Sequence, residues 1–417
     1  MRKKGLNSAV LGTCAAASLA ISALGVPSLA AGRTAGVAAS GVLGKPDPAK
    51  GSPVVFGAIN NETNQGADFP EARLAANATV NYINQYKDGL DGHPIKITWC
   101  ITDGTPSVSG NCARQLIADH PLAIVGATDL ADAVTIPAYA KAHLAYLGGM
   151  NFTPVENSAS NAVIFNDAAQ MGNVLSGQYA VQHLHGKHVA VIAIGDTQGE
   201  FTANSLWVPA IARAGGTAKV FEAPPTQADL SSVVESAISS GANVIGLESP
   251  SQCVALLSGL KSAGWKGPVI SIDTCSAPVT IRAVDGAANG MYWFQPYQLL
   301  STGTPDAKLA QAILAKWAPA TVAVDSPSLG EMSTLMDIWY GLHSMNPAKL
   351  NEQKILTAFR SGSRHRNFLA TAYTCNGKAI PAYRAVCNAG YYLYHTVNGS
   401  AVRIGSKTWT GVTSIIK

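Results

Sequence analysis

Short, almost continuously apolar runs alternate with helix-length segments from residue 53 onward. In the first part of the chain this pattern predicts strands at 54–59, 95–101, 123–126 and 145–147 and helices at 70–86, 107–119 and 131–143. Strands that are apolar on both faces and separated by helices are typical of a parallel sheet covered on both sides. The predicted fold class is therefore α/β, doubly wound.

The same alternation begins again near residue 169. It predicts helices at 169–185, 203–214, 230–240 and 253–263 and strands at 189–194, 218–222, 244–247 and 269–272. A chain of 417 residues is also too long for a single hydrophobic core. Because two similar α/β halves follow one another, we expect two doubly wound, Rossmann-like lobes.

The pattern changes after residues 291–295, where helices dominate. They are predicted at 306–317, 329–343 and 351–361. Alternating side chains at 390–396 and 401–404 flank an Asn-Gly pair at 398–399. This arrangement predicts a terminal β-hairpin.

The first 31 residues have the features of a secretory leader. Arg2-Lys3-Lys4 gives a basic start, residues 9–26 are mostly small and apolar, and Ser28-Leu29-Ala30 offers a small-x-small cleavage pattern. We expect a signal peptide at 1–31, a flexible Gly-, Ala- and Pro-rich linker at 32–52, and a secreted or periplasmic, extracytoplasmic protein.

Cys14 lies inside this leader. A lipid anchor through Cys14 is not expected, because Thr13 fits such a site poorly and cleavage there would expose an apolar run. The remaining cysteines favour three local disulfides, Cys100 with Cys112, Cys253 with Cys275 and Cys375 with Cys387. Other connectivities stay open, and zinc is the weaker alternative because no pair has the short spacing of structural zinc ligands.

Composition and motifs exclude several classes of function. Charged residues make up 13% of the chain, and its net charge of +4 includes no long basic run, so nucleic acid is not an expected partner. The sequence lacks phosphate-loop and dinucleotide fingerprints and a Gly-x-Ser-x-Gly elbow, so we expect no cofactor and no enzymatic activity. His183, His185 and His188 suit a helix C-terminus better than a metal site.

Several segments together resemble type I periplasmic binding proteins, in the branched-chain amino acid and amide receptor branch of ABC transporters. The opening match is the strand at 54–59, a helix ending in Val80-Asn-Tyr-Ile-Asn84, and Gly89-Leu-Asp-Gly-His-Pro-Ile-Lys96. Further matches are at 123–128, 147–154 and 290–294, so the resemblance extends from about residue 54 to residue 404.

This resemblance implies a fold with two lobes joined by three crossovers. It places 53–167 and 298–371 in lobe 1, and 168–297 and 372–417 in lobe 2. The lobes of such proteins close like a hinge around a small solute, and a membrane permease recognises the closed form. We therefore expect a monomeric solute-binding protein that delivers its ligand to an ABC importer. The alternatives are a sensor domain for a membrane signalling partner and, less favoured, a secreted α/β hydrolase.

Carrying the family's ligand site over by position gives candidates in loops that follow the strands. In lobe 1 they are the loop 60–69 with Phe69, and Thr128, Asp129, Met150, Asn151 and Phe152; in lobe 2 they are Gln198, Glu248, Ser249, Asp273 and Thr274. By resemblance, Thr128 and the backbone of 150–152 would bind a ligand carboxylate. Thr128 and Asp129 equally suit the cap of the helix that follows.

The sequence departs from the family pattern at important positions. Asn151 and Phe152 stand where amino acid receptors usually have a small residue followed by threonine, and Gln198 stands where they usually have tyrosine. These departures place amino acid specificity in doubt. The two phenylalanines, Phe69 and Phe152, suit an apolar or aromatic ligand body, and Asp129, Glu248 or Asp273 suit an amine. Candidate ligands are an amino acid, an amide or a small aromatic or carboxylate solute.

Overall fold

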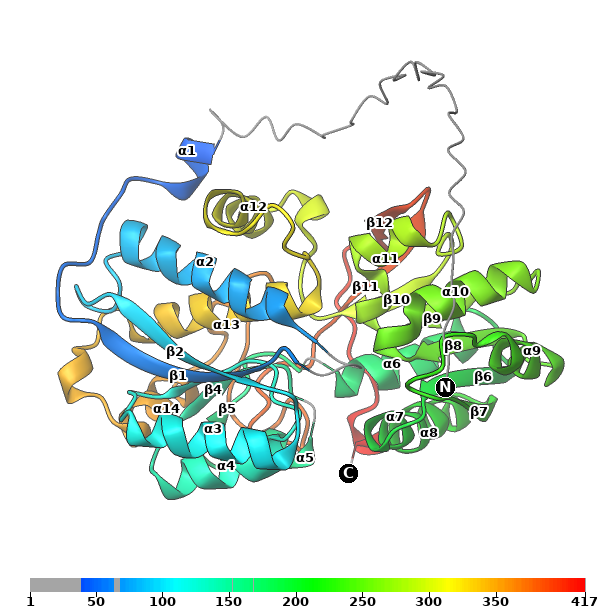
Figure 1. Cartoon of the computed structure of the whole chain (residues 1–417), viewed down its shortest axis with the longest axis horizontal. Helices are drawn as coiled ribbons and strands as arrows, with labels where there is room; N and C mark the ends of the chain where they lie inside the picture. The colour runs from blue at the N-terminus through cyan, green and yellow to red at the C-terminus, as the bar shows by residue number, and fades with distance from the viewer. Residues whose placement is uncertain (1–38, 64–67, 152, 168, 417) are drawn as a thin grey trace, which may run out of the picture. The chain divides into compact units, whose positions relative to one another are not determined.

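The computed structural model describes residues 39–63, 68–151, 153–167 and 169–416. The predicted signal peptide therefore lies outside the described residues. Within them the strands form two separate sheets, each flanked by helices (Figure 1). This arrangement confirms the predicted α/β class with two lobes.

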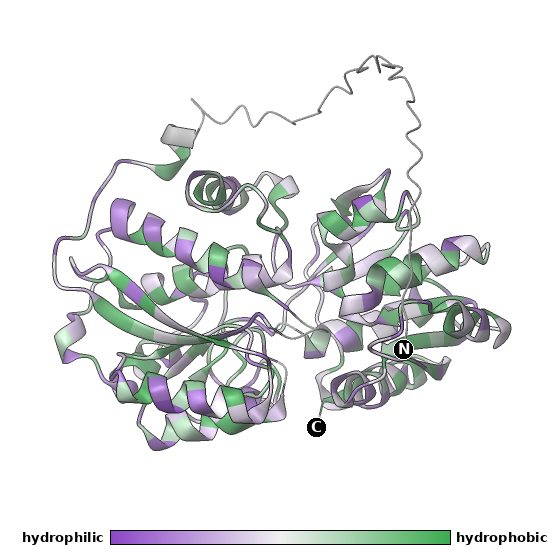
Figure 2. Ribbon diagram, viewed as in Figure 1, coloured by the Kyte–Doolittle hydropathy of each residue, from purple (hydrophilic) through white to green (hydrophobic). Residues whose placement is uncertain are grey.

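The first sheet is parallel throughout and has the strand order β2-β1-β3-β4-β5. Its strands are β1 (Val54–Asn61), β2 (Ile95–Thr102), β3 (Ile124–Gly126), β4 (Tyr146–Gly148) and β5 (Ala162–Val163). The intervening helices are α2 (Pro70–Tyr86), α3 (Pro106–Ala118), α4 (Asp132–Lys141) and α5 (Pro154–Ser158). Strand β1 is almost wholly buried and mostly hydrophobic (Figure 2), as a strand covered on both faces must be.

The second sheet has the order β12-β11-β10-β9-β8-β6-β7. Its parallel strands are β6 (His188–Ile194), β7 (Thr217–Ala223), β8 (Val244–Glu248), β9 (Val269–Ser271) and β10 (Tyr292–Gln295). The terminal hairpin, β11 (Tyr392–Val397) and β12 (Ser400–Arg403), extends it antiparallel to β10. The associated helices are α6 (Gln170–Gln182), α9 (Ser231–Ser239), α10 (Cys253–Ser262) and α11 (Pro278–Ala283).

The helices that follow β10 return to the first sheet. They are α12 (Pro305–Trp317), α13 (Ser326–Leu342) and α14 (Glu352–Arg360). Helix α13 packs on α2, β3 and β4, and Leu329, Met332 and Leu335 on it belong to the first lobe's core. Short 3-10 turns lie at Pro250–Gln252, Asp273–Ser276, Leu300–Thr302, Pro347–Lys349 and Thr413–Ile415.

One predicted helix begins earlier than expected. We predicted 203–214, whereas the structure has α7 (Thr197–Thr202), a π-helical turn (Ala203–Trp207) and α8 (Val208–Arg213) in direct succession. Asp196 explains the early start, because its side chain accepts a hydrogen bond from the Gly199 N–H at 2.8 Å and so caps the first turn. The segment after β6 is therefore the start of a helix and not a loop.

The predicted flexible linker at 32–52 differs from the structure over its second part. Residues Ala39–Leu43 form α1, and the side chain of Leu43 is buried in the first lobe's core. The Asp47 N–H donates to Gln85 O at 3.0 Å, and the Ala49 N–H donates to Asn84 O at 2.9 Å. Burial of one leucine and these backbone hydrogen bonds hold the segment against α2.

The predicted lobe boundary at residue 372 also differs from the contacts observed. The Ile164 N–H donates to Ala385 O and the Cys387 N–H donates to Ile164 O, both at 2.9 Å. These bonds place 385–388 beside the end of the first sheet. We therefore propose that the last crossover lies near residue 389, just before the hairpin of the second sheet.

The cysteine pairing predicted from sequence is confirmed: the structure joins Cys100 to Cys112, Cys253 to Cys275 and Cys375 to Cys387. The second of these bonds links the start of α10, which follows β8, to the 3-10 turn that follows β9. It therefore ties together the two segments that continue from neighbouring strands of the second sheet.

Among the helices of the described ranges, none combines the length and the apolar character that crossing a bilayer requires.

Candidate functional site

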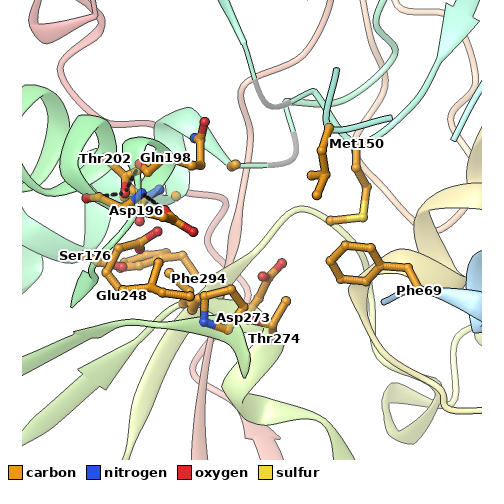
Figure 3. Close-up of a pocket in the computed structure, with 18 of the residues that line it drawn as sticks. Phe69, Met150, Ser176, Asp196, Gln198, Thr202, Glu248, Asp273, Thr274 and Phe294 are labelled. Atoms are coloured by element: carbon orange, nitrogen blue, oxygen red, sulfur yellow. Dashed lines mark hydrogen bonds between the residues drawn. The ribbon is translucent and has the colours of Figure 1, made fainter. Parts of the chain in front are cut away.

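A cavity of about 580 Å³ lies between side chains of the two lobes (Figure 3). On the second lobe it is lined where parallel strands end, by Ile194 of β6, Glu248 of β8 and Ile272 after β9. Carboxyl ends of parallel strands meet at one edge of a sheet, which is where open α/β sheets bind ligands. The cavity therefore lies at the carboxyl edge of the second sheet, as expected from the parallel order of its strands.

Helix α6 contributes one face to the same cavity. Ala169, Gly172, Asn173 and Ser176 line it, and their spacing puts them on one side of a helix. A Cβ at Gly172 would come within 3.0 Å of the Tyr391 ring, so glycine permits this tyrosine to approach the helix. Tyr391 also lines the cavity, and its hydroxyl donates to Asp167 O at 2.8 Å.

The first lobe contributes an apolar wall, which consists of Phe69, Leu130 and Met150. Figure 3 shows Phe69 and Met150 on the side of the cavity opposite Glu248 and Asp196. Phe69 is held by its backbone, because its N–H donates to Asn61 O at 2.9 Å and its carbonyl accepts from Asn60 Nδ2 at 2.8 Å.

The second lobe contributes an acidic wall, which consists of Asp196, Glu248 and Asp273. No Lys, Arg or His is among the described residues that line the cavity. Burial raises the pKa of Glu248 to about 7, with a smaller contribution from the charges of Asp273 and Asp196. Burial likewise raises the pKa of Asp273 to about 7, and the charge of Asp325 adds to this effect.

Two side chains, Trp207 and Thr202, offer hydrogen-bond donors to Glu248. Its side chain is almost fully buried, with 7% of the residue exposed. Trp207 Nε1 donates to Glu248 Oε2 at 3.2 Å, but the same N–H lies closer, at 2.8 Å, to Asn173 Oδ1. A single indole N–H shared between two acceptors satisfies neither fully.

The candidate site residues of the second lobe mostly lie at the cavity. Gln198, Glu248, Asp273 and Thr274 line it. Ser249 does not, because its hydroxyl is buried and donates to Gln252 Oε1 at 2.7 Å. Ser249 therefore supports the turn after β8.

Thr128 and Asp129, predicted in the first lobe, are buried away from the cavity. Thr128 Oγ1 donates to Asn60 Oδ1 at 2.5 Å. Asp129 accepts from Thr135 Oγ1 at 2.6 Å and from the Ala131 N–H at 3.1 Å, so it supports the start of α4. Their hydrogen bonds within the lobe favour the capping interpretation over ligand contact.

Of the other candidates in the first lobe, two line the cavity and one does not. Phe69 and Met150 line the cavity, whereas Asn151 is buried and its Nδ2 donates to Asp167 Oδ1 at 3.0 Å. The Met150 N–H, expected to bind a ligand carboxylate, donates to Ala127 O at 3.2 Å. Phe152 lies outside the described residues.

Sequence reasoning missed Asp196, Ser176, Phe294 and Tyr391 as lining residues. Asp196 carried a usable signal, since an aspartate two residues after the end of a strand and three residues before a glycine suits a helix N-cap. Ser176 lies on a face of small and polar residues in α6. Phe294 and Tyr391 reach the cavity from β10 and the last crossover, and nothing local in the sequence marks them.

Within the described ranges, no set of three His, Cys, Asp or Glu side chains is arranged to hold a metal ion. His183, one of the histidines considered for that role, stacks on Tyr179 with ring centroids 4.6 Å apart. His188 Nδ1 lies 2.8 Å from Thr217 Oγ1.

Solved structures with the same fold cover nearly the whole folded chain. A leucine binding protein from Thermotoga maritima has a TM-score of 0.69 and 14% identity over 84% of this chain and 98% of its own. A solute binding protein of an ABC transporter from R. palustris, in complex with 4-hydroxybenzoate, has a TM-score of 0.72 and 15% identity over 86% of this chain and 97% of its own. A fatty acid ABC transporter substrate-binding protein from Thermomonospora curvata has a TM-score of 0.72 and 17% identity over 89% of this chain and 96% of its own.

At these identities the neighbours establish the fold alone. No curated protein matches the sequence. The profile of the family described as periplasmic binding protein matches residues 53–386, which is most of the chain. This protein therefore belongs to the periplasmic binding protein family.

Proposed function

We propose that this chain is the exported solute-binding component of an ABC importer and that its ligand binds in the cavity between the apolar and acidic walls. The observation that carries the proposal is the position of this cavity. It lies at the carboxyl ends of β6, β8 and β9 and has lining residues from both lobes. Its volume of about 580 Å³ suits a small solute.

The role requires a difference in affinity between open and closed forms. A solute that touches only one lobe does not favour closure, whereas one that contacts Phe69 on one side and Glu248 on the other does. The closed form is then the signal that a permease recognises. We propose binding without catalysis, in keeping with a family of binding proteins.

Two further features support export. The sequence of 1–31 predicts a signal peptide, and the described chain holds three disulfides, which persist in oxidising compartments outside the cytoplasm. N-terminal sequencing of the protein recovered from its native host should begin near residue 32. Recovery of the uncleaved chain would contradict export through this leader.

The structural neighbours bear on the ligand class only broadly. Their printed names mention leucine, 4-hydroxybenzoate and fatty acid, each for the protein concerned. All three are small solutes, which supports small-solute binding here. The ligand class of this chain has to be argued from its own cavity, which has an acidic wall.

A thermal unfolding screen tests the proposal. The purified protein is mixed with amino acids, amides, short acids, aromatic acids and amines, and a true ligand at about 100 times its Kd should stabilise the fold by about 2.7 kcal/mol. Ser176→Leu, which places a larger side chain in the cavity, should abolish the shift. Ser232→Leu, an exposed serine on α9, is the matched control and should retain it. No shift with any compound would contradict the proposal.

A further inference from the structure

We propose that the solute is a cationic amine without a carboxylate, whose ammonium group binds between Glu248 and Asp273 and whose apolar body contacts Phe69 and Met150. This inference rests on the proposed binding function and assigns its substrate class. It differs from the amino acid and carboxylate ligands that the sequence resemblance suggested.

The charge of the cavity is the first argument. The described lining residues include three carboxylic acids, Asp196, Glu248 and Asp273, and no basic side chain. A buried carboxylate is costly unless a positive charge or several hydrogen bonds accompany it. An ammonium ion supplies both, whereas a ligand carboxylate would add a further negative charge to the cavity.

Unused acceptors are the second argument, and they are independent of the charge count. Glu248 is 7% exposed, and both of its side-chain donors are shared: the Trp207 indole N–H lies closer to Asn173 Oδ1, and the Thr202 hydroxyl also lies within hydrogen-bond distance of Gln198 O and Gly199 O. Asp273 Oδ2 is buried and has no hydrogen-bond partner at normal distance among the described residues, while Ser326 and the backbone N–H groups of Asp273 and Thr274 are the donors near this carboxyl. An ammonium group has three donors and no acceptor, which matches this deficit.

The backbone N–H groups at helix N-termini, which could hold an anionic ligand, are largely occupied. Helix N-termini usually offer free N–H groups to a carboxylate. Here the Gly199 N–H donates to Asp196 at 2.8 Å, the Met171 N–H to Asp167 at 2.6 Å, and the Ser328 N–H to Asp325 at 3.2 Å. The chain's own aspartates therefore occupy these three helix starts. At the start of α2, beside Phe69, no side chain caps the helix, and its first residue, Pro70, has no N–H to offer.

The apolar wall defines the rest of the ligand. Phe69 and Met150 face the acids across the cavity (Figure 3), and Leu130 and the ring of Phe294 add to the apolar lining. A hydrocarbon body bound there leaves water, and aromatic rings also attract a nearby cation. An alkyl or aryl amine contains both parts, whereas a small polyol or sugar lacks the charged one.

Matched ligand series test the inference by calorimetry at pH 8. One series is 2-phenylethylamine, phenylalanine and 3-phenylpropionate; the other is 3-methylbutylamine, leucine and 4-methylpentanoate. Within each series the body is kept and the charged groups change. We expect the amine to bind at least about tenfold more tightly than its amino acid and its acid, since removing one partner of a buried charged pair typically has an effect of this size.

Variants locate the binding group. Glu248→Gln and Asp273→Asn should each weaken binding of the better amine by at least about tenfold. Glu222→Gln, an exposed glutamate in β7, is the matched control and should change affinity less than about twofold. Circular dichroism confirms that each variant is folded, so that a loss of binding is not a loss of structure.

The outcomes separate the two proposals. If the amino acid or the acid binds and the amine does not, the amine assignment is wrong while the binding function stands. Amine binding that is unchanged in Glu248→Gln and Asp273→Asn also overturns the assignment. If neither these series nor the wider screen yields any ligand, the binding function itself fails.

Discussion

The two walls of the cavity differ in chemistry and in how they are built. Phe69, Leu130 and Met150 on the first lobe are apolar, whereas the second lobe supplies Asp196, Glu248 and Asp273. The charged groups that line the cavity therefore all come from the second lobe, whereas apolar contacts come from both lobes, since Ile272 and Phe294 of the second lobe also line it. A ligand that contacts the acids on the second lobe and Phe69 or Met150 on the first gains its full set of contacts only when the lobes close, so its affinity depends on closure.

The largest expected effect concerns the disulfide beneath the acidic wall. Replacing Cys253 and Cys275 together by serine should destabilise the protein by about 3 kcal/mol and also weaken ligand binding, because the bond ties the segments that carry Glu248 and Asp273. Urea unfolding and calorimetry measure the two effects.

The control is the pair Cys375 and Cys387, whose serine variant should lose a similar stability of about 3 kcal/mol but keep its affinity. Equal losses of affinity in both variants would show that the disulfides act only on global stability.

A second prediction concerns the stability of the free protein. Burial raises the pKa of Glu248 from 4.5 to about 7, so the folded state prefers the protonated carboxyl. The stability that Glu248 contributes is full below pH 4.5 and is lost as the pH rises through about 7. Glu248→Gln should therefore gain stability relative to wild type between pH 4.5 and pH 8, by up to about 3 kcal/mol.

Denaturant unfolding across this pH range measures the gain, and the exposed Glu222→Gln gives the baseline. A Glu248→Gln variant that is less stable than wild type at pH 8, after correction by that baseline, would mean that the carboxylate is well paired without a ligand.

On the apolar wall, Phe69→Ala should weaken binding of any ligand with a hydrocarbon body by about 1–3 kcal/mol, because the aromatic contact area is lost. The loss should be the same at pH 6 and pH 8, since this wall carries no titrating group. Met150→Leu, a nearly volume-conserving change, is the control and should have a small effect. Calorimetry at both pH values makes the comparison.

The smallest effect on binding is expected at Thr128, which resemblance had placed in the site. Thr128→Val removes the hydrogen bond to Asn60 and should destabilise the first lobe by about 1 kcal/mol. Ligand affinity should change less than about twofold. Thr274→Val, at a residue that does line the cavity, serves as the comparison. A larger loss of affinity in Thr128→Val would return this residue to the site.

The two walls also differ in how far the sequence predicted them. The periodic pattern located the long strands and most of the helices of both lobes, since strands buried on both faces leave continuous apolar runs. It missed the short elements α5, β5 and α11 and the early start of the helix after β6. Glu248 and Asp273 were predictable because each follows such a run directly. Because each residue is at or just beyond the end of a parallel strand, it lies at the carboxyl edge of the sheet whatever the conformation of the loop after it.

The first lobe was harder to predict because its loop residues can bond within their own lobe. Thr128, Asp129 and Asn151 are short polar residues after strands, as the polar lining residues of the second lobe are, yet each forms buried hydrogen bonds to its own lobe. Tyr391 is distant in sequence from the other lining residues. Residues of these kinds require the tertiary structure, because no local pattern distinguishes a ligand contact from an internal one.

Proton release on ligand binding tests the central claim most directly. The amine of 2-phenylethylamine stays protonated between pH 6 and pH 8, so only the protein titrates in this range. Glu248 responds to the charges of Asp273 and Asp196, and Asp273 to that of Asp325. A bound cation favours the ionised form of Glu248 and Asp273, whose pKa is about 7 in the free protein.

Calorimetry at pH 6.5 in buffers of different ionisation enthalpy counts the protons exchanged. We expect release of about one proton or more per ligand at this pH, falling toward zero above pH 8, and less release in Glu248→Gln. Binding with no proton release at any pH, or with proton uptake, would contradict the placement of the ammonium group between these two carboxylates.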